Sequence, residues 1–422
     1  MKPFSFVHGA DLHLDSPFTG VTAQAPDVAE ALRAATFEAF QSLIQLCLDR
    51  RPAFLLLAGD VYDGADRSLR AQLRFRDGLA TLAEQGIRSF VVHGNHDPLE
   101  GWSSSITWPP EVHVFGKDTV ETVTVEKDGS PIAAVSGVSY GRRRETRNLA
   151  QRFSAEERGG LFQIALLHCN CGANADHEAY APCSLSDLQG AGFDYWALGH
   201  VHEKAVLTES PYVVYPGNTQ GRHIREQGER GCYWVTVNEA HNAAVEFCAL
   251  DAVRWLTGEV RIDDFDTIDR LERGLAETVE TFREHADGRS VVCRIALAGR
   301  GPLYKELRRP NAVADLLEHV RERFASERPF VWLEAIEANC RPEVDLAKRR
   351  KGTDLLAQVL NEAGDIRGGQ DLREALAPVL DDLFEDGRAR KALDPLGEDE
   401  LRRVLDEAEL LCLDMLEGEG EE

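Results

Sequence analysis

Several features that would mark a special class of protein are missing from this sequence. No uninterrupted apolar run approaches the ~20 residues that a membrane-spanning helix requires. The first residues contain neither the apolar region nor the small-residue cleavage site of a secretory signal. Internal repeats and long low-complexity segments are missing as well. We therefore expect an ordinary folded protein of the cytoplasm, with no membrane segment.

Paired cysteines are also missing. The nine cysteines are scattered and odd in number, and no two of them form a Cys-x-x-Cys pair. Cys169 and Cys171 are one residue apart, too close for a usual structural zinc site. Most of the cysteines are therefore expected to be small buried apolar residues in a reducing compartment.

Net positive charge is missing too. The chain has 47 Lys and Arg residues against 72 Asp and Glu residues, which gives a net charge of −25 and a pI near 5.0. This balance argues against a protein that coats nucleic acid by bulk electrostatics. It permits an enzyme that binds phosphates locally, through metal ions and a few arginines.

The pattern of the first 250 residues predicts a layered α/β domain. At 422 residues the chain is long for one core, because domains commonly have ~100–200 residues. Short β-branched or leucine-rich runs alternate with amphipathic helical patterns, which predicts central β-sheets flanked by helices. Strands are expected at residues 4–9, 54–58, 89–92, 132–138, 162–167 and 195–198, and helices at 26–50 and 68–85.

Two further regions follow this domain, which we place at residues 1–250. Residues 251–341 read as a small α/β accessory or capping domain with the order β-α-β-α-β. Its strands are expected at 256–262, 291–297 and 330–337, and its helices at 267–285 and 312–324. Residues 342–422 are acidic and show only helical patterns. The last pattern, 399–415, has one apolar face, which either packs on its own domain or fits a groove on a partner.

Five short polar motifs each come directly after a predicted strand. In layered α/β folds, ligands bind beyond the carboxyl ends of strands, so these loops are expected to converge on one site. In Asp-x-His and His-x-His, the two-residue spacing puts both side chains on the same side of the chain. The motifs are Asp11-Leu12-His13, Gly59-Asp60-Val61-Tyr62-Asp63, Gly94-Asn95-His96-Asp97, His168 and Gly199-His200-Val201-His202.

The residue types in these motifs suit a pair of divalent metal ions. Two cations ~3.5–4 Å apart can clamp a phosphate and activate water for in-line attack. They need one bridging carboxylate, with imidazoles and amide or carboxylate oxygens at the other positions. Such a mixture suits Mn, Fe or Zn better than Ca or Mg alone. A single histidine or Gly-Asp turn is usually structural, so it is the ordered set of five that favours a metal site.

The ordered set resembles the calcineurin-like metallophosphoesterase superfamily. Within it, the chain is similar to the DNA repair exonucleases of the SbcD/YhaO group. Two stretches carry this likeness, Ala10-Asp11-Leu12-His13-Leu14-Asp15-Ser16-Pro17-Phe18 and Tyr215-Pro216-Gly217-Asn218-Thr219-Gln220-Gly221-Arg222-His223. The resemblance is strong over roughly residues 1–250 and rests only on the order of elements beyond them. It implies a layered metallophosphoesterase fold and hydrolysis of phosphodiesters by a metal-bridged hydroxide.

The resemblance also implies two divalent metal ions, with Mn²⁺ favoured over Fe or Zn, and a ligand set for each. The ligands of the first ion would be Asp11, His13, Asp60 and His202. Asp60 would bridge the two ions. The second ion would be completed by Asn95, His168 and His200.

Three further motif residues would support the reaction. His96 resembles the family's catalytic histidine, which stabilises the scissile phosphate and protonates the leaving oxygen. Asp97 would orient His96 through a hydrogen bond. The alternative for Asp97 is a helix N-cap or turn residue ahead of Pro98. Relatives have a histidine at the position of Asp63, so the role of that histidine is not transferred, and a supporting carboxylate is the alternative.

The resemblance, rather than the composition, predicts that the substrate is DNA, with exonuclease activity on ends and possible endonuclease activity on single strands. It implies a partner as well, an ABC-type ATPase of the SbcC/YhaN kind docked through C-terminal helices, and a homodimer. Two basic clusters are candidates for DNA binding, and either could equally be a solvated charge run. They are Arg142, Arg143, Arg144 and Arg147, and Lys348, Arg349, Arg350 and Lys351.

Two other functions stay open from the sequence. The metal motifs do not separate a nuclease from a calcineurin-like phosphodiesterase or phosphatase that acts on a small nucleotide or another phosphoester. The second motif lacks the arginine with which protein phosphatases of the superfamily usually continue it. The other alternative is a non-catalytic subunit that binds DNA ends or an ATPase, although every expected ligand and His96 is present.

Overall fold

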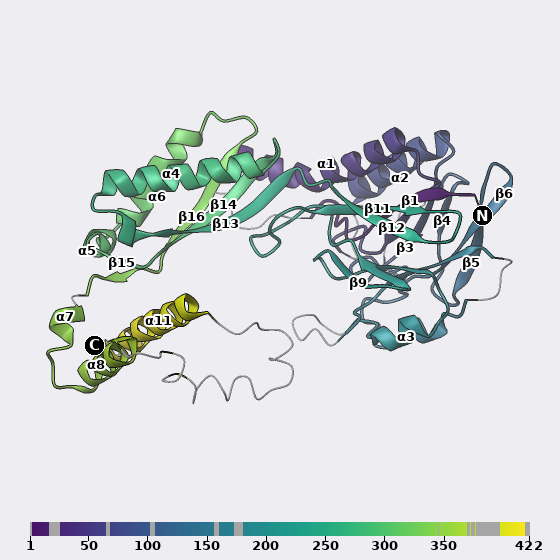
Figure 1. The fold of residues 1–422 in the computed structure, drawn as a ribbon. Coiled ribbons are helices and arrows are strands. Elements are labelled where there is room, and N and C mark those ends of the chain that lie inside the picture. Colours follow the sequence, from purple (N-terminus) through teal and green to yellow (C-terminus); the bar gives the residue numbers. More distant parts are fainter. Residues whose placement is uncertain are drawn as a thin grey trace. The chain divides into compact units, whose positions relative to one another are not determined.

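The computed structural model divides the chain into two compact units (Figure 1). The first comprises residues 1–298 and 306–339, and the second comprises residues 299–305 and 340–422. The structure describes residues 2–16, 26–64, 68–101, 106–155, 160–172, 180–344, 346–368, 372, 376 and 397–417. Pro17 and Phe18 of the first family-like stretch lie outside these residues, as does most of 369–396 in the predicted helical tail.

The first unit contains a six-stranded sheet in which four neighbouring strands are parallel and a terminal hairpin is antiparallel. Its buried strands are short apolar runs; every residue of β2, for example, is buried. The sheet consists, in spatial order, of β12 (Ala243–Ala249), β11 (Gly231–Val237), β1 (Phe4–Gly9), β2 (Phe54–Ala58), β3 (Arg88–Val92) and β4 (Val112–Val114).

A second six-stranded sheet has a parallel centre with an antiparallel strand at each edge. In β7, all seven residues are buried, as expected for a strand that is covered on both faces. The sheet consists, in spatial order, of β5 (Glu121–Lys127), β6 (Ser130–Val138), β7 (Phe162–His168), β8 (Tyr195–Gly199), β10 (Tyr212–Tyr215) and β9 (Ala205–Glu209).

The two sheets pack face to face and helices cover their outer faces. Phe6 and Phe54 of the first sheet share a core with Ile164 and Tyr195 of the second. Helices α1 (Pro26–Arg50) and α2 (Leu69–Glu84) cover the first sheet, and short α3 (Leu185–Gln189) packs beside the second with the 3-10 turn η1 (Ala150–Arg152). Ser68 caps α2 by accepting a hydrogen bond from the N–H of Ala71 at 3.0 Å.

The rest of the first unit is a smaller α/β region. Its strands form a parallel sheet in the order β13-β14-β16, and apolar faces of its two long helices are buried. Its elements are β13 (Val253–Arg261), η2 (Ile262–Asp264), α4 (Ile268–His285), β14 (Ser290–Ala298), α6 (Ala312–Phe324) and β16 (Val331–Ala338). Val253 and Trp255 of β13 pack with Leu32 and Ala35 of α1 in one apolar cluster.

The second unit is mostly helical. Two short strands pair in parallel, and α11 packs along α8 through Leu401, Leu405 and Leu413. Its elements are β15 (Arg300–Gly301), β17 (Arg341–Pro342), α7 (Leu346–Arg349), α8 (Leu355–Gly368) and α11 (Glu398–Glu417), and α5 (Tyr304–Leu307) spans the boundary between the units.

The layered α/β fold with terminal helices is confirmed, and every predicted strand and helix is present within three residues of its expected bounds. Six of the nine cysteines are buried, as expected for most of them. The strands β4, β5, β9, β10, β11, β12, β15 and β17 were not predicted. Among the described residues, no helix combines the length and apolar character that crossing a membrane would require.

Candidate metal centre

The five predicted motifs lie at the carboxyl ends of β1, β2, β3, β7 and β8, which belong to the two facing sheets. Backbone hydrogen bonds join the first two loops directly. The N–H of Asp11 donates to Gly59 O at 3.0 Å, and the N–H of His13 donates to Asp60 O at 3.0 Å. The strand ends therefore bring the predicted side chains together, as ligand-binding loops do in layered α/β folds.

Four of the predicted ligands have a backbone conformation that residues with side chains rarely adopt. Their φ angles are positive, at 51° for Asp11, 42° for His13, 48° for Asp60 and 105° for His200. The left-handed region costs a residue with a β-carbon roughly 1–2 kcal/mol, and such strain gathers at functional sites. We infer that the fold keeps these turns because they direct the side chains into the site.

Two glycines leave the space in which these side chains meet. A β-carbon at Gly94 would lie 2.3 Å from Asp60 Oδ1 and 2.7 Å from His168 Nε2. A β-carbon at Gly59, whose φ is +92°, would lie 2.4 Å from His168 Nδ1. Because no side chain fits at either position, glycine is required wherever Asp60 and His168 take these places.

Asp11, His13 and His202 form one group, in which a ligand atom from each lies within 4.8 Å of the others. The Nδ1–H of His13 donates to Asp63 at 2.9 Å, and the Nδ1–H of His202 donates to Glu226 at 2.7 Å. These bonds use the Nδ1 protons, so in the neutral form of each ring the Nε2 atom carries a lone pair. The two Nε2 atoms are only 3.2 Å apart. A cation bound by both would stabilise this arrangement.

Asp11, Asp60 and His168 form a second group with the same spacing. Asp60 Oδ2 lies 3.4 Å from His168 Nε2 and 4.0 Å from Nε2 of His13, a member of the first group. Asn95 Oδ1 lies 3.0 Å from His168 Nε2 and 3.2 Å from His200 Nδ1. Asp11 belongs to both groups, and Asp60 of the second group lies beside His13 of the first. The bridging role of Asp60 stays a prediction.

Burial and mutual charge set the protonation of the centre. Burial raises the pKa of Asp11 to about 6 and lowers the pKa of His13 to about 3. Burial alone would raise the pKa of Asp60, but the charge of His168 holds it well below its usual range. Burial also opposes a charge on His168, yet Asp60 raises the pKa of His168 to about 9. A bound cation would take the place of the proton that balances this carboxylate.

His96 lies at the edge of the cluster, with 32% of its side chain exposed. Its backbone N–H donates to Asp60 Oδ1 at 2.9 Å, and its ring centroid is 4.9 Å from that of His13. Asp63 Oδ1 lies 3.6 Å from His96 Nδ1. Asp63 also accepts a hydrogen bond from the hydroxyl of Ser16 at 2.9 Å. These contacts fit a supporting carboxylate, the alternative given for Asp63.

Asp97 is fully buried and bonds to the loops that carry the site. Its carboxylate accepts hydrogen bonds from the N–H groups of Gly94 at 2.8 Å and Val61 at 2.9 Å, and it lies 2.9 Å from His93 Nδ1. These contacts hold the β2 and β3 loops together, which suits the turn role that was the alternative for Asp97. The hydrogen bond from Asp97 to His96 stays a prediction.

Arg222 and Glu226 are site residues to which the sequence had assigned no role. Arg222 Nη1 donates to Asp63 Oδ1 at 2.9 Å, and its Nη2 lies 3.3 Å from His202 Nδ1. Burial opposes the charge of Glu226, but its bond with His202 and the charge of Arg222 hold the pKa of Glu226 well below its usual range. A signal was present, because Arg222 belongs to the second stretch that resembles the family.

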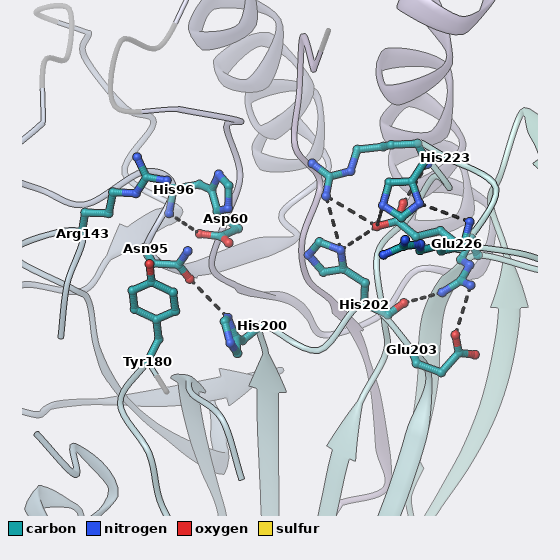
Figure 2. A pocket seen from close by; sticks show the side chains of 13 residues that line it. Asp60, Asn95, His96, Arg143, Tyr180, His200, His202, Glu203, His223 and Glu226 are labelled. Atoms are coloured by element: carbon teal, nitrogen blue, oxygen red, sulfur yellow. Dashed lines mark hydrogen bonds and ion pairs between the residues drawn. The ribbon is translucent and has the colours of Figure 1, made fainter. Parts of the chain in front are cut away.

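A cavity of about 820 Å³ opens onto the cluster (Figure 2). His96 and His202 line it, together with Arg143 and Arg225. Both arginines are exposed, and neither side chain has a hydrogen bond or ion pair with another described residue. The cavity therefore offers two exposed cations beside the predicted metal ligands.

The other arginines of the first basic cluster are engaged elsewhere. Arg142 pairs with Glu100 at 3.0 Å and Arg147 pairs with Glu145 at 2.5 Å. Arg144 lines a separate depression beside them. Arg143 is thus the member of this predicted cluster that lines the cavity.

Two members of the second basic cluster have structural partners. Arg349 pairs with Asp354 at 2.9 Å. Arg350 forms an ion pair with the buried Glu409 of α11. These pairs connect segments of the second unit, which leaves less charge available for DNA than the sequence suggested.

The donor set fits a pair of divalent cations. Two buried carboxylates, three buried imidazoles, one half-buried imidazole and one amide oxygen gather within a few ångströms of one another. Buried carboxylates are costly unless positive charge compensates them. Nitrogen and oxygen donors in this mixture suit Mn, Fe or Zn.

Comparison with known proteins agrees with the predicted resemblance. Residues 4–204 match the family described as calcineurin-like phosphoesterase, and residues 255–341 match the family described as metallophosphoesterase YhaO, middle domain. Over 413 residues the chain is 33% identical to the uncharacterized metallophosphoesterase YhaO of Bacillus subtilis strain 168. That match covers 97% of each chain.

DNA repair proteins are similar at lower identity. The DNA double-strand break repair protein Mre11 of Aeropyrum pernix is 25% identical over 224 residues, which cover 50% of this chain and 52% of that protein. One component of the nuclease SbcCD of Bacillus subtilis is 26% identical over 140 residues, which cover 32% of this chain and 33% of that protein. The likeness to these two proteins is therefore partial.

Proposed function

The chain belongs to the calcineurin-like metallophosphoesterases, and on that premise we propose that it is a two-metal DNA phosphodiesterase, specifically an exonuclease. The observation that carries the proposal is the meeting of Asp11, His13, Asp60, His168 and His202 in two ligand groups that share Asp11. The similarity to a DNA break repair protein and to a nuclease component supports DNA as the substrate.

In this proposal the predicted ligands hold two divalent ions, and Mn²⁺ is the expected metal. When bound, the ions would polarise the phosphate and lower the pKa of water for in-line attack. Asp63 and Glu226 fix the tautomers of His13 and His202 so that each presents Nε2. The chain's own contribution is therefore to hold the Nδ1 protons of His13 and His202 on Asp63 and Glu226, which leaves each Nε2 available as a donor.

His96 would protonate the leaving oxygen. Its ring is partly exposed and lines the cavity, where a substrate can reach it. Asp63 Oδ1 lies 3.6 Å from its Nδ1, close enough to help orient the ring. A positioned acid of this kind typically contributes about 10²–10⁴ in rate.

The charge of the cavity lining favours a polymer over a small phosphoester. The volume of about 820 Å³ lies within the ~300–1,000 Å³ typical of ligand pockets, so the argument rests on the cations rather than on size. Arg143 and Arg225 are exposed cations on its lining, where they could bind phosphates next to the scissile one. A substrate with several phosphates would use both, whereas a small monoester would not.

The test is hydrolysis of end-labelled DNA, single- and double-stranded, by the purified chain with Mn²⁺. We expect metal-dependent degradation, and we expect Arg143→Glu to lower it at least tenfold while hydrolysis of bis-p-nitrophenyl phosphate stays within twofold. Arg142→Glu is the matched control, because Arg142 pairs with Glu100 outside this cavity. Hydrolysis of the small diester without any cleavage of DNA would favour the small-substrate alternative instead.

We further propose that the C-terminal helices bind an ABC-type ATPase, and that residues 1–250, 251–341 and 342–422 act as nuclease, accessory and docking regions. One side of α11 is buried through Leu401, Leu405 and Leu413. Val404, Leu411 and Met415 form a second apolar stripe, with 44%, 60% and 65% exposure. The helix thus packs on its own unit through one side, and its exposed apolar stripe supports the proposal that a partner binds the other side.

Charged residues in this stripe should disrupt such docking. We expect Leu411→Asp together with Met415→Asp to abolish co-purification with an SbcC/YhaN-type ATPase while nuclease activity of the isolated chain is unchanged. Arg403→Asp adds the same side chain at an exposed position of the same helix and should bind normally. Retention of the partner by the double variant would contradict the assignment of this face.

A further inference from the structure

We propose that the segment from Gly217 to Arg230 is a coupling loop, which transmits the position of the β13 strand to the histidines of the first metal ion. In this proposal Glu226 and Arg222 are positioning residues. The inference rests on the metal centre of the proposed function and is independent of whether the substrate is DNA.

One side of the coupling loop forms a hydrogen bond with the ring of His202. Glu226 is buried, and its Oε1 accepts the hydrogen bond from His202 Nδ1 at 2.7 Å. Its Oε2 accepts hydrogen bonds from Asn218 Nδ2 at 2.9 Å and from the N–H of Arg222 at 2.7 Å. Both oxygens are therefore committed, and the carboxylate is fixed by the loop's own residues rather than by solvent.

Arg222 links the coupling loop to His13 through Asp63. Its guanidinium donates to Asp63 at 2.9 Å, and Asp63 in turn accepts from His13 Nδ1 at 2.9 Å. The guanidinium also lies 3.5 Å from Glu226. One chain of charged contacts therefore orients the two rings whose Nε2 atoms face each other.

The other side of the coupling loop is bonded to β13. Gln220 is buried, and its Oε1 accepts from the N–H groups of Ala252 at 2.8 Å and Val253 at 3.2 Å. Trp255 Nε1 donates to Gly221 O at 2.8 Å, and Gly228 N–H donates to Trp255 O at 3.0 Å. The start of the smaller α/β region is thus attached to both halves of the loop.

Arg230 closes the coupling loop at its far end. Its backbone carbonyl accepts from the N–H of Leu250 at 2.8 Å, just ahead of β13. Its buried guanidinium donates to the backbone carbonyl of His202. A shift of β13 would therefore move the backbone and the ring of His202 together.

The first test measures Mn²⁺ binding by calorimetry, without substrate. We expect Glu226→Ala to weaken one of the two binding events about 10- to 100-fold, the usual effect of removing a carboxylate that orients a ligand histidine. Glu226→Gln keeps the shape of the side chain and one of its two oxygen acceptors, so it should weaken the same event less than Glu226→Ala. Some weakening is still expected, because its amide N–H₂ would face the donors Asn218 and Arg222. Glu209→Ala removes an exposed carboxylate of β9, outside the coupling loop, and should bind as wild type.

As a control for folding, the thermal unfolding temperature of each metal-free variant is measured. If Glu226→Ala fails to fold, Glu226→Gln carries the test. Equal weakening of both metal events, or wild-type affinity in the folded variants, would overturn the positioning role.

The second test asks whether β13 acts on the metal. Trp255→Phe removes the hydrogen bond to Gly221 but keeps an aromatic ring, and a bond of about 1 kcal/mol predicts roughly fivefold weaker Mn²⁺ binding. Trp332→Phe is the control for the change from Trp to Phe. Trp332 lies on β16 of the same sheet and forms a cation–π contact with Arg321, which is not part of the coupling loop. Unchanged affinity in Trp255→Phe would limit the proposal to Glu226 and Arg222, and so overturn the coupling. Failure to cleave DNA would refute the proposed substrate and leave these results intact.

Discussion

Replacing His96 with alanine is expected to lower the rate of DNA hydrolysis by about 10²–10⁴ while both metal ions still bind. His96 belongs to neither of the two proposed ligand groups, although it forms a third set with His13 and Asp63. Its link to Asp60 is through the backbone N–H at 2.9 Å, which alanine keeps. The substitution therefore removes the acid without removing a contact of the proposed bridging carboxylate.

The leaving group distinguishes an acid from other roles of His96. A p-nitrophenolate leaves with little protonation, whereas the sugar oxygen of DNA needs a proton. We therefore expect His96→Ala to lose much less activity on bis-p-nitrophenyl phosphate than on DNA. His319→Ala, an exposed histidine of α6, should match the wild type on both substrates. Equal losses on both substrates would contradict the acid role, and weakened Mn²⁺ binding would make His96 a ligand.

The buried parts of the fold were predictable because burial leaves a strong signal in the sequence. β2 is a run of five buried apolar residues, and α1 was predicted with the bounds that the structure shows. Two of the strands that were missed have no buried residue. In β9 every residue is partly or fully exposed, and in β12 every residue is half-buried or exposed. Their place at sheet edges depends on the neighbouring strands rather than on their own composition.

The candidate site was predictable where a ligand follows a buried strand, and less so where loops meet. Asp11, Asp60 and His168 could be found because each stands at the end of such a run. Glu226 meets His202 across 24 residues, and Arg222 meets Asp63 across 159 residues. No local pattern encodes such pairings, because they depend on how the coupling loop folds back over the site.

Asp97 shows the limit of reasoning from neighbours in the sequence. Its position beside His96 suggested a bond between the two side chains. The structure shows the carboxylate accepting the N–H of Val61 across 36 residues and the N–H of Gly94 within its own turn. The bond to His96 stays a prediction, and the contact with Val61 is one that no local pattern in the sequence indicates.

Gly94 provides the second prediction with a large effect. Gly94→Ala adds one methyl group, and we expect Mn²⁺ affinity to fall by more than about 100-fold, beyond what losing a supporting partner costs. The new carbon would lie 2.3 Å from Asp60 Oδ1 and 2.7 Å from His168 Nε2, so both side chains would have to move. Calorimetry with Mn²⁺ measures the loss directly, and Gly64→Ala is the control, since a β-carbon there meets nothing within 4 Å.

The hydrogen bonds of Asp60 and His168 explain why moving either side chain would cost free energy. Asp60 Oδ1 also accepts the N–H of His96, and His168 Nδ1–H donates to Ala58 O at 2.9 Å, so either movement breaks a buried hydrogen bond. Overpacking of this kind typically costs about 1–3 kcal/mol of stability, which thermal unfolding of the metal-free variant would reveal. A folded Gly94→Ala variant that binds two Mn²⁺ ions with wild-type affinity would mean that Asp60 and His168 do not hold the metal from these positions.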